Sequence, residues 1–146
     1  MKDRFKFRAW DKENKKYIYG VEKGLEFYST AGNLRVMTLA EIAESSRYDL
    51  EQCTGLKDKN GKLIYEGDIV EVTSPENWNI FDEYSNSEIL GKGVVVIKPR
   101  CAFIKKNDID GEEKEYYFAL YSVVEDADVE VIGNIHENPE LLEEDR

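Results

Sequence analysis

The hydrophobic and polar positions of this chain are most clearly patterned between Tyr48 and Thr73. The polar pair Asn60-Gly61 lies between two apolar-containing runs, the second of which is Leu63-Ile64-Tyr65. An Asn-Gly pair accepts positive φ, as a tight hairpin turn requires, and β-branched and aromatic residues suit a pleated strand. From Gly67-Asp68 the chain resumes with apolar and polar residues in alternation. The stretch therefore predicts two strands closed by a turn and a third strand that starts at a turn or bulge.

A strand is also predicted over Arg4–Trp10, where the side chains alternate between apolar and basic. We expect Phe5, Phe7 and Ala9 to face inward, opposite a cationic face. Residues 1–16 hold seven Lys or Arg against three acidic residues. Aromatic residues among cations can stack on nucleic-acid bases, but this period puts the two on opposite faces. The aromatic residues are therefore expected in the core, and the cations beside acidic neighbours.

Further short strands are predicted from β-branched or aromatic runs that lie between turn residues. They are Tyr17–Val21, Leu25–Tyr28, Gly93–Ile97 (buried on both faces or closing a barrel), Cys101–Ile104, Tyr116–Tyr121 and Val129–Ile135. Thr38 and Glu41 match a capping box and predict a short helix, and Asn138-Pro139 predicts a final helical turn. The expected fold is mostly β, a small barrel or strongly bent antiparallel sheet with SH3-like barrel elements and one or two short helices.

The chain length of 146 residues is enough for one domain with a sizeable core. We expect a single domain over residues 1–146. Within it, residues 1–47 form a hairpin and a short helix that pack on a β-barrel core of residues 48–138, and residues 139–146 form a tail.

The charge balance limits the classes of partner. Twenty Lys and Arg against 31 Asp and Glu give a net charge of −11, which repels phosphate backbones and anionic membranes and favours a cationic partner. The sequence has no run of 18 apolar residues, so no membrane span is expected. Cys53 and Cys101 are too few for a disulfide framework, and the charged N-terminus does not resemble a signal peptide, so we expect a reducing cytosol. Self-association stays open, because exposed strand edges and the uneven charge favour it.

The segment Pro75–Lys92 is the candidate binding site. It is longer than an ordinary turn, and overlong loops in compact domains are usually functional or disordered. Its aromatic and acidic residues predict contact with another protein; the residues proposed to bind are Trp78, Phe81, Asp82, Glu83 and Tyr84.

Patterns that could indicate chemistry have simpler explanations. The runs at Asp58–Gly61 and Asp108–Gly111 echo a calcium loop, but both lack the first carboxylate and the closing glutamate, so turn formation explains them. His136 is the only histidine, and the two cysteines are expected to be small buried hydrophobes. Among 31 acidic residues no pair stands out as a catalytic dyad. We therefore expect no catalytic residues, no metal site, no cofactor and no enzyme activity.

Three separate blocks of the sequence resemble one family. FKFRAWDKENKKY, TGLKDKNGKLIYEGDIV and VIGNIHENPELL occur in the order found in YopX-like proteins of phages and prophages, whereas residues 24–47 and 74–92 look like variable regions. The resemblance implies a β-rich, barrel-containing fold and expression in the cytoplasm of a bacterial host. It supplies no catalytic residues.

These observations favour a phage or prophage accessory protein that binds a host or phage protein without catalysis. Two alternatives stay open. One is a small-barrel nucleic-acid-binding protein, which residues 1–16 favour and the net charge opposes. The other is an acidic DNA mimic that inhibits a host enzyme by occupying its basic site.

Overall fold

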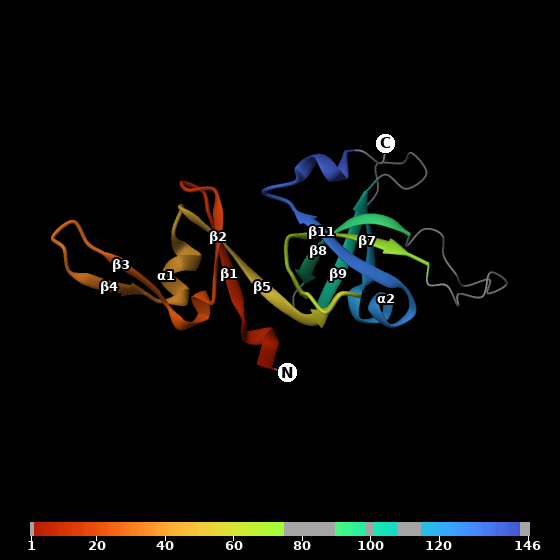
Figure 1. Cartoon of the computed structure of the whole chain (residues 1–146), viewed down its shortest axis with the longest axis horizontal. Helices are drawn as coiled ribbons and strands as arrows, with labels where there is room; N and C mark the ends of the chain where they lie inside the picture. Colours follow the sequence, from red (N-terminus) through yellow and green to blue (C-terminus); the bar gives the residue numbers. More distant parts are fainter. Residues whose placement is uncertain (1, 75–89, 99–100, 108–114, 144–146) are drawn as a thin grey trace. The chain divides into compact units, whose positions relative to one another are not determined.

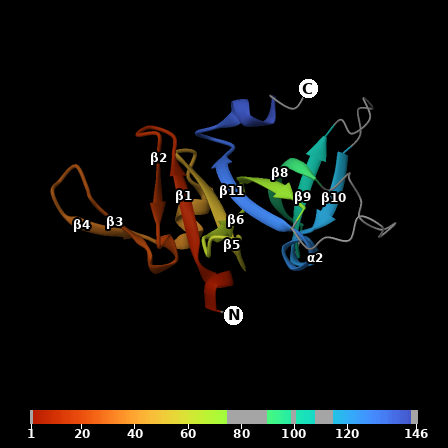
Figure 2. The ribbon, with the colours of Figure 1, turned by 45° about the vertical axis from the view of Figure 1, so that its right-hand side comes forward.

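The computed structural model describes residues 2–74, 90–98, 101–107 and 115–143. They form a mostly β fold with two α-helices and a curled, half-barrel antiparallel sheet, which confirms the predicted fold class (Figures 1 and 2). The chain divides into two compact units, Met1–Cys53 and Thr54–Arg146. The predicted packing of residues 1–47 on a core of residues 48–138 stays a prediction. No helix in the described ranges is both long enough and apolar enough to cross a membrane.

The first unit is built on a short antiparallel sheet. Strand β1 (Phe7–Asp11) pairs on one side with β2 (Lys16–Tyr19) and on the other with the first part of β5 (Tyr48–Lys57). Helix α1 (Leu39–Glu44), the 3-10 turn η2 (Val21–Lys23) and a separate hairpin of β3 (Leu25–Tyr28) and β4 (Leu34–Met37) complete the unit. Its core consists of Ala9, Val21 and Ile42.

Helix α1 begins as predicted. The Thr38 side chain accepts a hydrogen bond from the Glu41 backbone amide (3.2 Å), and the Glu41 carboxylate accepts one from the Thr38 amide (3.2 Å). This reciprocal pair satisfies amides that the first helical turn leaves without a partner.

The prediction that the first strand starts at Arg4 is wrong. Residues Lys2–Phe5 form a 3-10 turn, η1, and the strand begins at Phe7. The Lys6 amide donates to the Asp3 carbonyl (3.1 Å) and the Lys6 ammonium pairs with the Asp3 carboxylate (2.9 Å), so local contacts close a turn. As a result Phe5 is 72% exposed rather than in the core.

The second unit is a five-stranded antiparallel sheet in the order β10-β9-β8-β7-β11. Its strands are β7 (Asp68–Thr73), β8 (Gly91–Lys98), β9 (Cys101–Asn107), β10 (Glu115–Ala119) and β11 (Asp128–Asn134). The second part of β5 pairs with β6 (Leu63–Tyr65), and the turn between them lies at the predicted Asn60-Gly61, where Gly61 has φ 84°. The run over residues 93–97 is buried only at alternate positions, so the prediction of burial on both faces is wrong.

Helix α2 (Leu120–Asp126) replaces the end of a predicted strand. The strand predicted over Tyr116–Tyr121 ends at Ala119. Leu120, Val123 and Ala127 are all buried, and this spacing places them on one face of a helix that packs into the core of the curled sheet. In both views α2 lies at one end of that sheet (Figures 1 and 2).

Hydrogen bonds from backbone amides to polar side chains hold the chain reversal after β11. A final 3-10 turn, η5 (Pro139–Leu142), begins at the predicted proline. Asn138 does not cap this turn; its side-chain oxygen instead accepts a hydrogen bond from the Asn134 amide (3.3 Å). The Asn134 side chain in turn accepts from the amides of His136 (3.1 Å) and Glu137 (2.8 Å). The block that resembles a family signature thus forms a network that fixes the chain reversal.

Candidate functional site

The candidate site predicted from the sequence lies between two neighbouring strands. Strands β7 and β8 are paired antiparallel with Val72 opposite Gly91, and residues 74–90 connect them. Neighbouring antiparallel strands can be joined by two to five residues, so the pairing does not require a connection of this length. The five residues predicted to bind a partner all fall in this connection and outside the described residues: Trp78, Phe81, Asp82, Glu83 and Tyr84.

The described end of the connection is fixed to the sheet. Leu90 packs against the core of the second unit, and its carbonyl accepts a hydrogen bond from the Lys106 ammonium. Gly91 has φ 107°, a backbone conformation that residues other than glycine rarely adopt. Gly93 is equally constrained by packing, because a Cβ atom there would lie 2.5 Å from Cγ2 of Ile104. The connection therefore returns to the sheet at a defined point.

The outer face of the sheet carries an aromatic pair beside two lysines. The rings of Phe103 and Tyr117 meet edge to face with centroids 6.3 Å apart, and the Lys98 ammonium lies 4.6 Å from the Tyr117 ring centroid. Lys98 donates to the Tyr117 hydroxyl (2.9 Å), which donates to Glu115 (2.8 Å), and Lys105 pairs with the same carboxylate (3.2 Å). The hydrogen bond from Tyr117 lowers the pKa of Glu115 below its ordinary value. The Glu115 carboxylate is therefore charged at neutral pH and pairs with Lys105.

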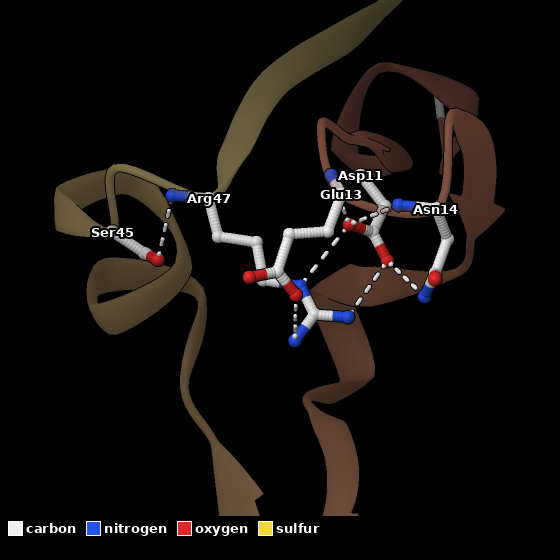
Figure 3. A network of polar contacts seen from close by, with 5 residues as sticks. All are labelled: Asp11, Glu13, Asn14, Ser45 and Arg47. Carbon is white, nitrogen blue, oxygen red and sulfur yellow. Dashed lines mark hydrogen bonds and ion pairs between the residues drawn. The ribbon is translucent and has the colours of Figure 1, made fainter.

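A network of polar contacts surrounds Asp11 in the first unit (Figure 3). The Arg47 guanidinium donates through Nε to Oδ1 and through a terminal nitrogen to Oδ2 of Asp11, each at 3.0 Å, and also pairs with Glu13 (3.0 Å). The amides of Glu13 and Asn14 and the Asn14 side chain donate to the same carboxylate. These hydrogen bonds hold the pKa of Asp11 far below its usual range, and the bond from Arg47 has the largest effect. Asp11 is therefore an ionised structural acid at neutral pH, unsuited to proton transfer there.

A buried ion pair lies on the same sheet. Nε of Arg8 lies 2.8 Å from the Glu51 carboxylate, which also accepts a hydrogen bond from the Tyr17 hydroxyl (3.0 Å). The Arg8 guanidinium lies 4.1 Å from the centroid of the Tyr17 ring. Arg8 and Lys6 thus have acidic neighbours, as expected for the basic residues near the N-terminus.

The calcium-like run at Asp58 is a turn. Oδ1 of Asp58 accepts the amides of Asn60 and Lys62, each at 2.9 Å, and Oδ2 accepts the amide of Val131 (3.0 Å) at the bulge in β11. The carboxylate therefore joins the β5–β6 turn to a strand 73 residues away. The second such run, at Asp108–Gly111, lies outside the described residues. In the part of the chain that the structure describes, no group of three or more His, Cys, Asp or Glu residues is arranged to hold a metal ion.

The two cysteines differ in environment. Cys53 is buried, as predicted, whereas Cys101 is exposed at the start of β9 and the prediction of burial is wrong for it. The apolar residues after Cys101 suggested a buried strand, but only Ile104 among the next three side chains is fully buried.

Sequence reasoning missed the second strand of the β3–β4 hairpin and its surface. Tyr28, Leu34 and Val36 are exposed by 75%, 54% and 54%. The residues 31–33, Ala-Gly-Asn, separate two apolar-containing runs and would have indicated the hairpin turn.

Comparisons with known proteins cover nearly the whole chain. The sequence model of the YopX protein family matches residues 6–143. The YopX protein derived from the SPbeta prophage of Bacillus subtilis strain 168 is 28% identical over 145 residues, which cover 94% of this chain and 95% of that relative. The crystal structure of protein EF1440 from Enterococcus faecalis has a TM-score of 0.55 and 26% identity, covering 94% of this chain and 96% of that one.

Proposed function

The chain belongs to the YopX protein family, and from this premise we propose that it is a phage- or prophage-encoded accessory protein of the bacterial cytoplasm that binds another protein. It acts through the β7–β8 connection of residues 74–90 and catalyses no reaction. The prophage origin of the Bacillus subtilis relative supports the genetic context.

One observation carries the proposal. The β7–β8 connection spans 17 residues between strands that are already paired up to Val72 and Gly91. A long connection costs more conformational entropy on folding than a short turn would, and the pairing of the two strands does not require it. Loops of this length in compact domains are usually functional or disordered. Trp78, Phe81 and Tyr84 within the connection belong to the residue types that dominate the binding energy at protein interfaces.

The charge of the chain supports a cationic partner. Residues 74–90 contain Glu76, Asp82, Glu83 and Glu88 and no Lys or Arg. Residues 54–146 contain ten Lys or Arg against 22 Asp or Glu. Such an excess increases the association rate with a basic surface and decreases it with an acidic one.

We propose that the protein is not an enzyme, because its buried acidic side chains serve to hold the fold together. Asp11, Glu51 and Asp58 are buried, and each accepts hydrogen bonds that hold strands or turns together. A general acid or base must instead reach a substrate.

The test compares the full chain with a variant that lacks residues 77–87. The full chain carrying a photo-crosslinking residue in place of Ser85, which is not one of the proposed binding residues, is expressed in lysogenic cells. The crosslinked protein is identified, purified and titrated against the unmodified full chain and the deletion variant. We expect the deletion and the triple change Trp78→Ser, Phe81→Ser and Tyr84→Ser to weaken binding at least about 100-fold, because hot-spot residues cost about 2 kcal/mol or more each.

A matched control is Tyr121→Ser, which removes an aromatic side chain that is 62% exposed on α2. It is expected to leave the affinity unchanged. Equal affinity of the deletion variant and the wild type for the crosslinked protein would refute the proposed site.

A second candidate, binding of single-stranded nucleic acid, has the Phe103–Tyr117 pair beside Lys98 in its favour. Fluorescence anisotropy with a labelled oligothymidylate at low salt tests it, because electrostatic attraction is strongest there. No binding under that condition removes this candidate.

A further inference from the structure

The turn between β5 and β6 exposes an Asn-Gly pair to solvent. Asn60 and Gly61 are both exposed, and a Cβ atom at Gly61 would meet nothing within 4 Å. No other asparagine of the sequence is followed by glycine. Water and hydroxide can therefore reach the backbone of this turn and the Asn60 side chain.

An asparagine before a glycine has a reactive neighbour in its own backbone. The amide nitrogen of the next residue can attack the side-chain carbon Cγ of the asparagine, because the two atoms close a succinimide ring. A glycine at the next position favours this attack, since it has no Cβ atom to obstruct the approach and its backbone adopts a wide range of conformations. Asparagine is among the thermolabile residues of proteins, and the Asn-Gly pair makes Asn60 the most reactive position for this chemistry in the chain.

The folded turn engages the atoms that this reaction needs. The Gly61 amide donates a hydrogen bond to the Asp58 carbonyl (3.0 Å), and the Asn60 amide donates to Oδ1 of Asp58 (2.9 Å). The Asp58 amide donates to the Lys62 carbonyl (2.8 Å) and so closes the loop. An amide nitrogen must lose its proton before it attacks, and a hydrogen-bonded amide exchanges its proton when the local structure opens. The folded turn is therefore expected to suppress the reaction.

Contacts with β11 hold the turn closed. Oδ2 of Asp58 accepts a hydrogen bond from the Val131 amide (3.0 Å), and the Lys59 amide donates to the Val129 carbonyl (2.8 Å). The Asp58 carboxylate is thus shared, because one oxygen accepts from the turn and the other accepts from the strand. Opening of the turn at Asp58 is therefore the step that frees the Gly61 amide.

We infer that Asn60 is a deamidation site, which the hydrogen bonds of Asp58 hold inactive in the folded protein and which local opening of the turn makes reactive. In the reaction, the Gly61 nitrogen gives its proton to hydroxide and forms a bond to Cγ of Asn60. The bond from Cγ to Nδ2 breaks, and Nδ2 leaves as ammonia after it takes up a proton from water. A water molecule then hydrolyses the succinimide. Hydrolysis at Cγ gives aspartate, and hydrolysis at the backbone carbonyl carbon gives isoaspartate.

Both products are expected to weaken the closed turn. Each carries a negative charge that asparagine lacks, in the same turn as the Asp58 carboxylate, and like charges repel at short distance. Isoaspartate also lengthens the backbone by a methylene group between Asp58 and Lys62, whose hydrogen bond closes the loop. The modified turn is therefore expected to lose part of its attachment to β11. This inference does not rest on the proposed function, because it involves a different segment of the chain.

The rate of deamidation of the full chain tests the inference. The protein is incubated at neutral pH, either folded or unfolded in urea, and peptide mapping by mass spectrometry measures asparagine, aspartate and isoaspartate at position 60. Folded wild type is expected to react at least about tenfold more slowly than unfolded wild type, because its reaction requires opening. The hydrogen-exchange protection factor of the Gly61 amide should be of the same order as this ratio. These two measurements need no variant and decide the question even where a variant does not fold.

The variant Asp58→Ala tests which group holds the site inactive. Its folded form is expected to react at least about tenfold faster than folded wild type, because hydrogen bonds to a charged acceptor are lost. In urea the two proteins should react at the same rate, which separates opening of the turn from a direct effect of the carboxylate on the chemistry. Gly93→Ala is the matched control, because it disturbs the packing of β8 and β9 in the same unit. Its folded form is expected to react at the wild-type rate, and circular dichroism verifies that both variants fold.

Four results would overturn the inference. If unfolded wild type does not deamidate at Asn60, the site is not reactive. If folded wild type reacts as fast as the unfolded chain, the turn does not protect it. If folded Asp58→Ala reacts as slowly as folded wild type, another group holds the turn closed. If Gly93→Ala accelerates the reaction as much as Asp58→Ala, global unfolding rather than opening of this turn controls the rate.

Discussion

Asp11 and Arg47 form a two-pronged ion pair between residues 36 positions apart, with both N–O distances at 3.0 Å. Asp11 ends β1, and Arg47 directly precedes β5, the strand that pairs with β1. The pair therefore closes this sheet at the point where the chain returns from the hairpin and α1. A carboxylate that is 1% exposed is costly to bury, so its stabilising effect depends on the full set of donors.

Removing the Asp11 carboxylate is expected to destabilise the first unit. Asp11→Ala should lower the free energy of unfolding by about 2–3 kcal/mol, because the amide donors of the turn lose a charged acceptor. Urea denaturation followed by tryptophan fluorescence measures this change. Glu13→Ala is the matched control, since Glu13 contacts the same guanidinium but its side chain is 67% exposed, and a change below about 1 kcal/mol is expected. A similar loss in both variants would contradict the central role of Asp11.

The same carboxylate predicts a dependence of stability on pH. The pKa of Asp11 is lower in the folded protein than its ordinary value of 3.8, which is expected for the unfolded chain. Its stabilising contribution is therefore fully present above the unfolded pKa and is lost as the pH falls toward the folded value. Urea denaturation between neutral pH and about pH 3 should show a smaller decrease for Asp11→Asn than for the wild type. Glu44→Gln, at an exposed position on α1, is expected to leave the wild-type decrease unchanged.

The sequence predicts most strands because their patterns have local physical causes. The chain turns at Gly61, where a positive φ is required. The capping box of Thr38 and Glu41 depends only on two residues three positions apart. The predictions are wrong where contacts between distant residues, rather than the local sequence pattern, determine the secondary structure. Leu120 and Val123 fit a strand or a helix by apolar character alone, and packing into the core of the curled sheet selects the helix.

The exposed apolar side chains of the β3–β4 hairpin were harder to predict, because exposure of an apolar residue has no local cause. Leu34 and Val36 follow a turn and flank the polar residue Arg35, as in a half-buried strand. Only the register of β3 and β4 and the single anchor at Leu25 and Met37 show that most of this hairpin stays uncovered.

Asp58 is expected to stabilise both the β5–β6 turn and the bulge of β11. Asp58→Ala removes the acceptor for the amides of Asn60, Lys62 and Val131, and should lower the free energy of unfolding by about 2–3 kcal/mol. Hydrogen exchange provides the specific readout, because the amide of Val131 should lose protection together with those of the turn. Asn60→Ala, at an exposed position of the same turn, should leave Val131 protected. Unchanged exchange at Val131 in the Asp58→Ala variant would contradict the proposed role of Asp58 in holding β11 to the turn.

Gly93 and Gly61 are expected to respond differently to alanine. A Cβ at Gly93 would lie 2.5 Å from Ile104 Cγ2 and 3.0 Å from the Lys105 carbonyl, so the two strands must separate, at a cost of about 1–3 kcal/mol. At Gly61 no atom lies within 4 Å, and only the φ of 84° opposes the substitution, at about 1 kcal/mol. Thermal unfolding of the two variants should rank Gly93→Ala as the less stable. The reverse order would mean that β8 and β9 can separate at little cost.

Shortening the β7–β8 connection is expected to preserve the sheet. Deleting residues 77–87 leaves six residues between Thr73 and Gly91, still enough to join strands paired at Val72 and Gly91. The entropy of closing a loop decreases with its length, so reducing 17 residues to six should raise the free energy of unfolding by about 1 kcal/mol. Urea denaturation of the deletion variant and the wild type measures the difference. A loss of stability would show that these residues contribute to the fold, and the deletion could then no longer serve as a test of binding alone.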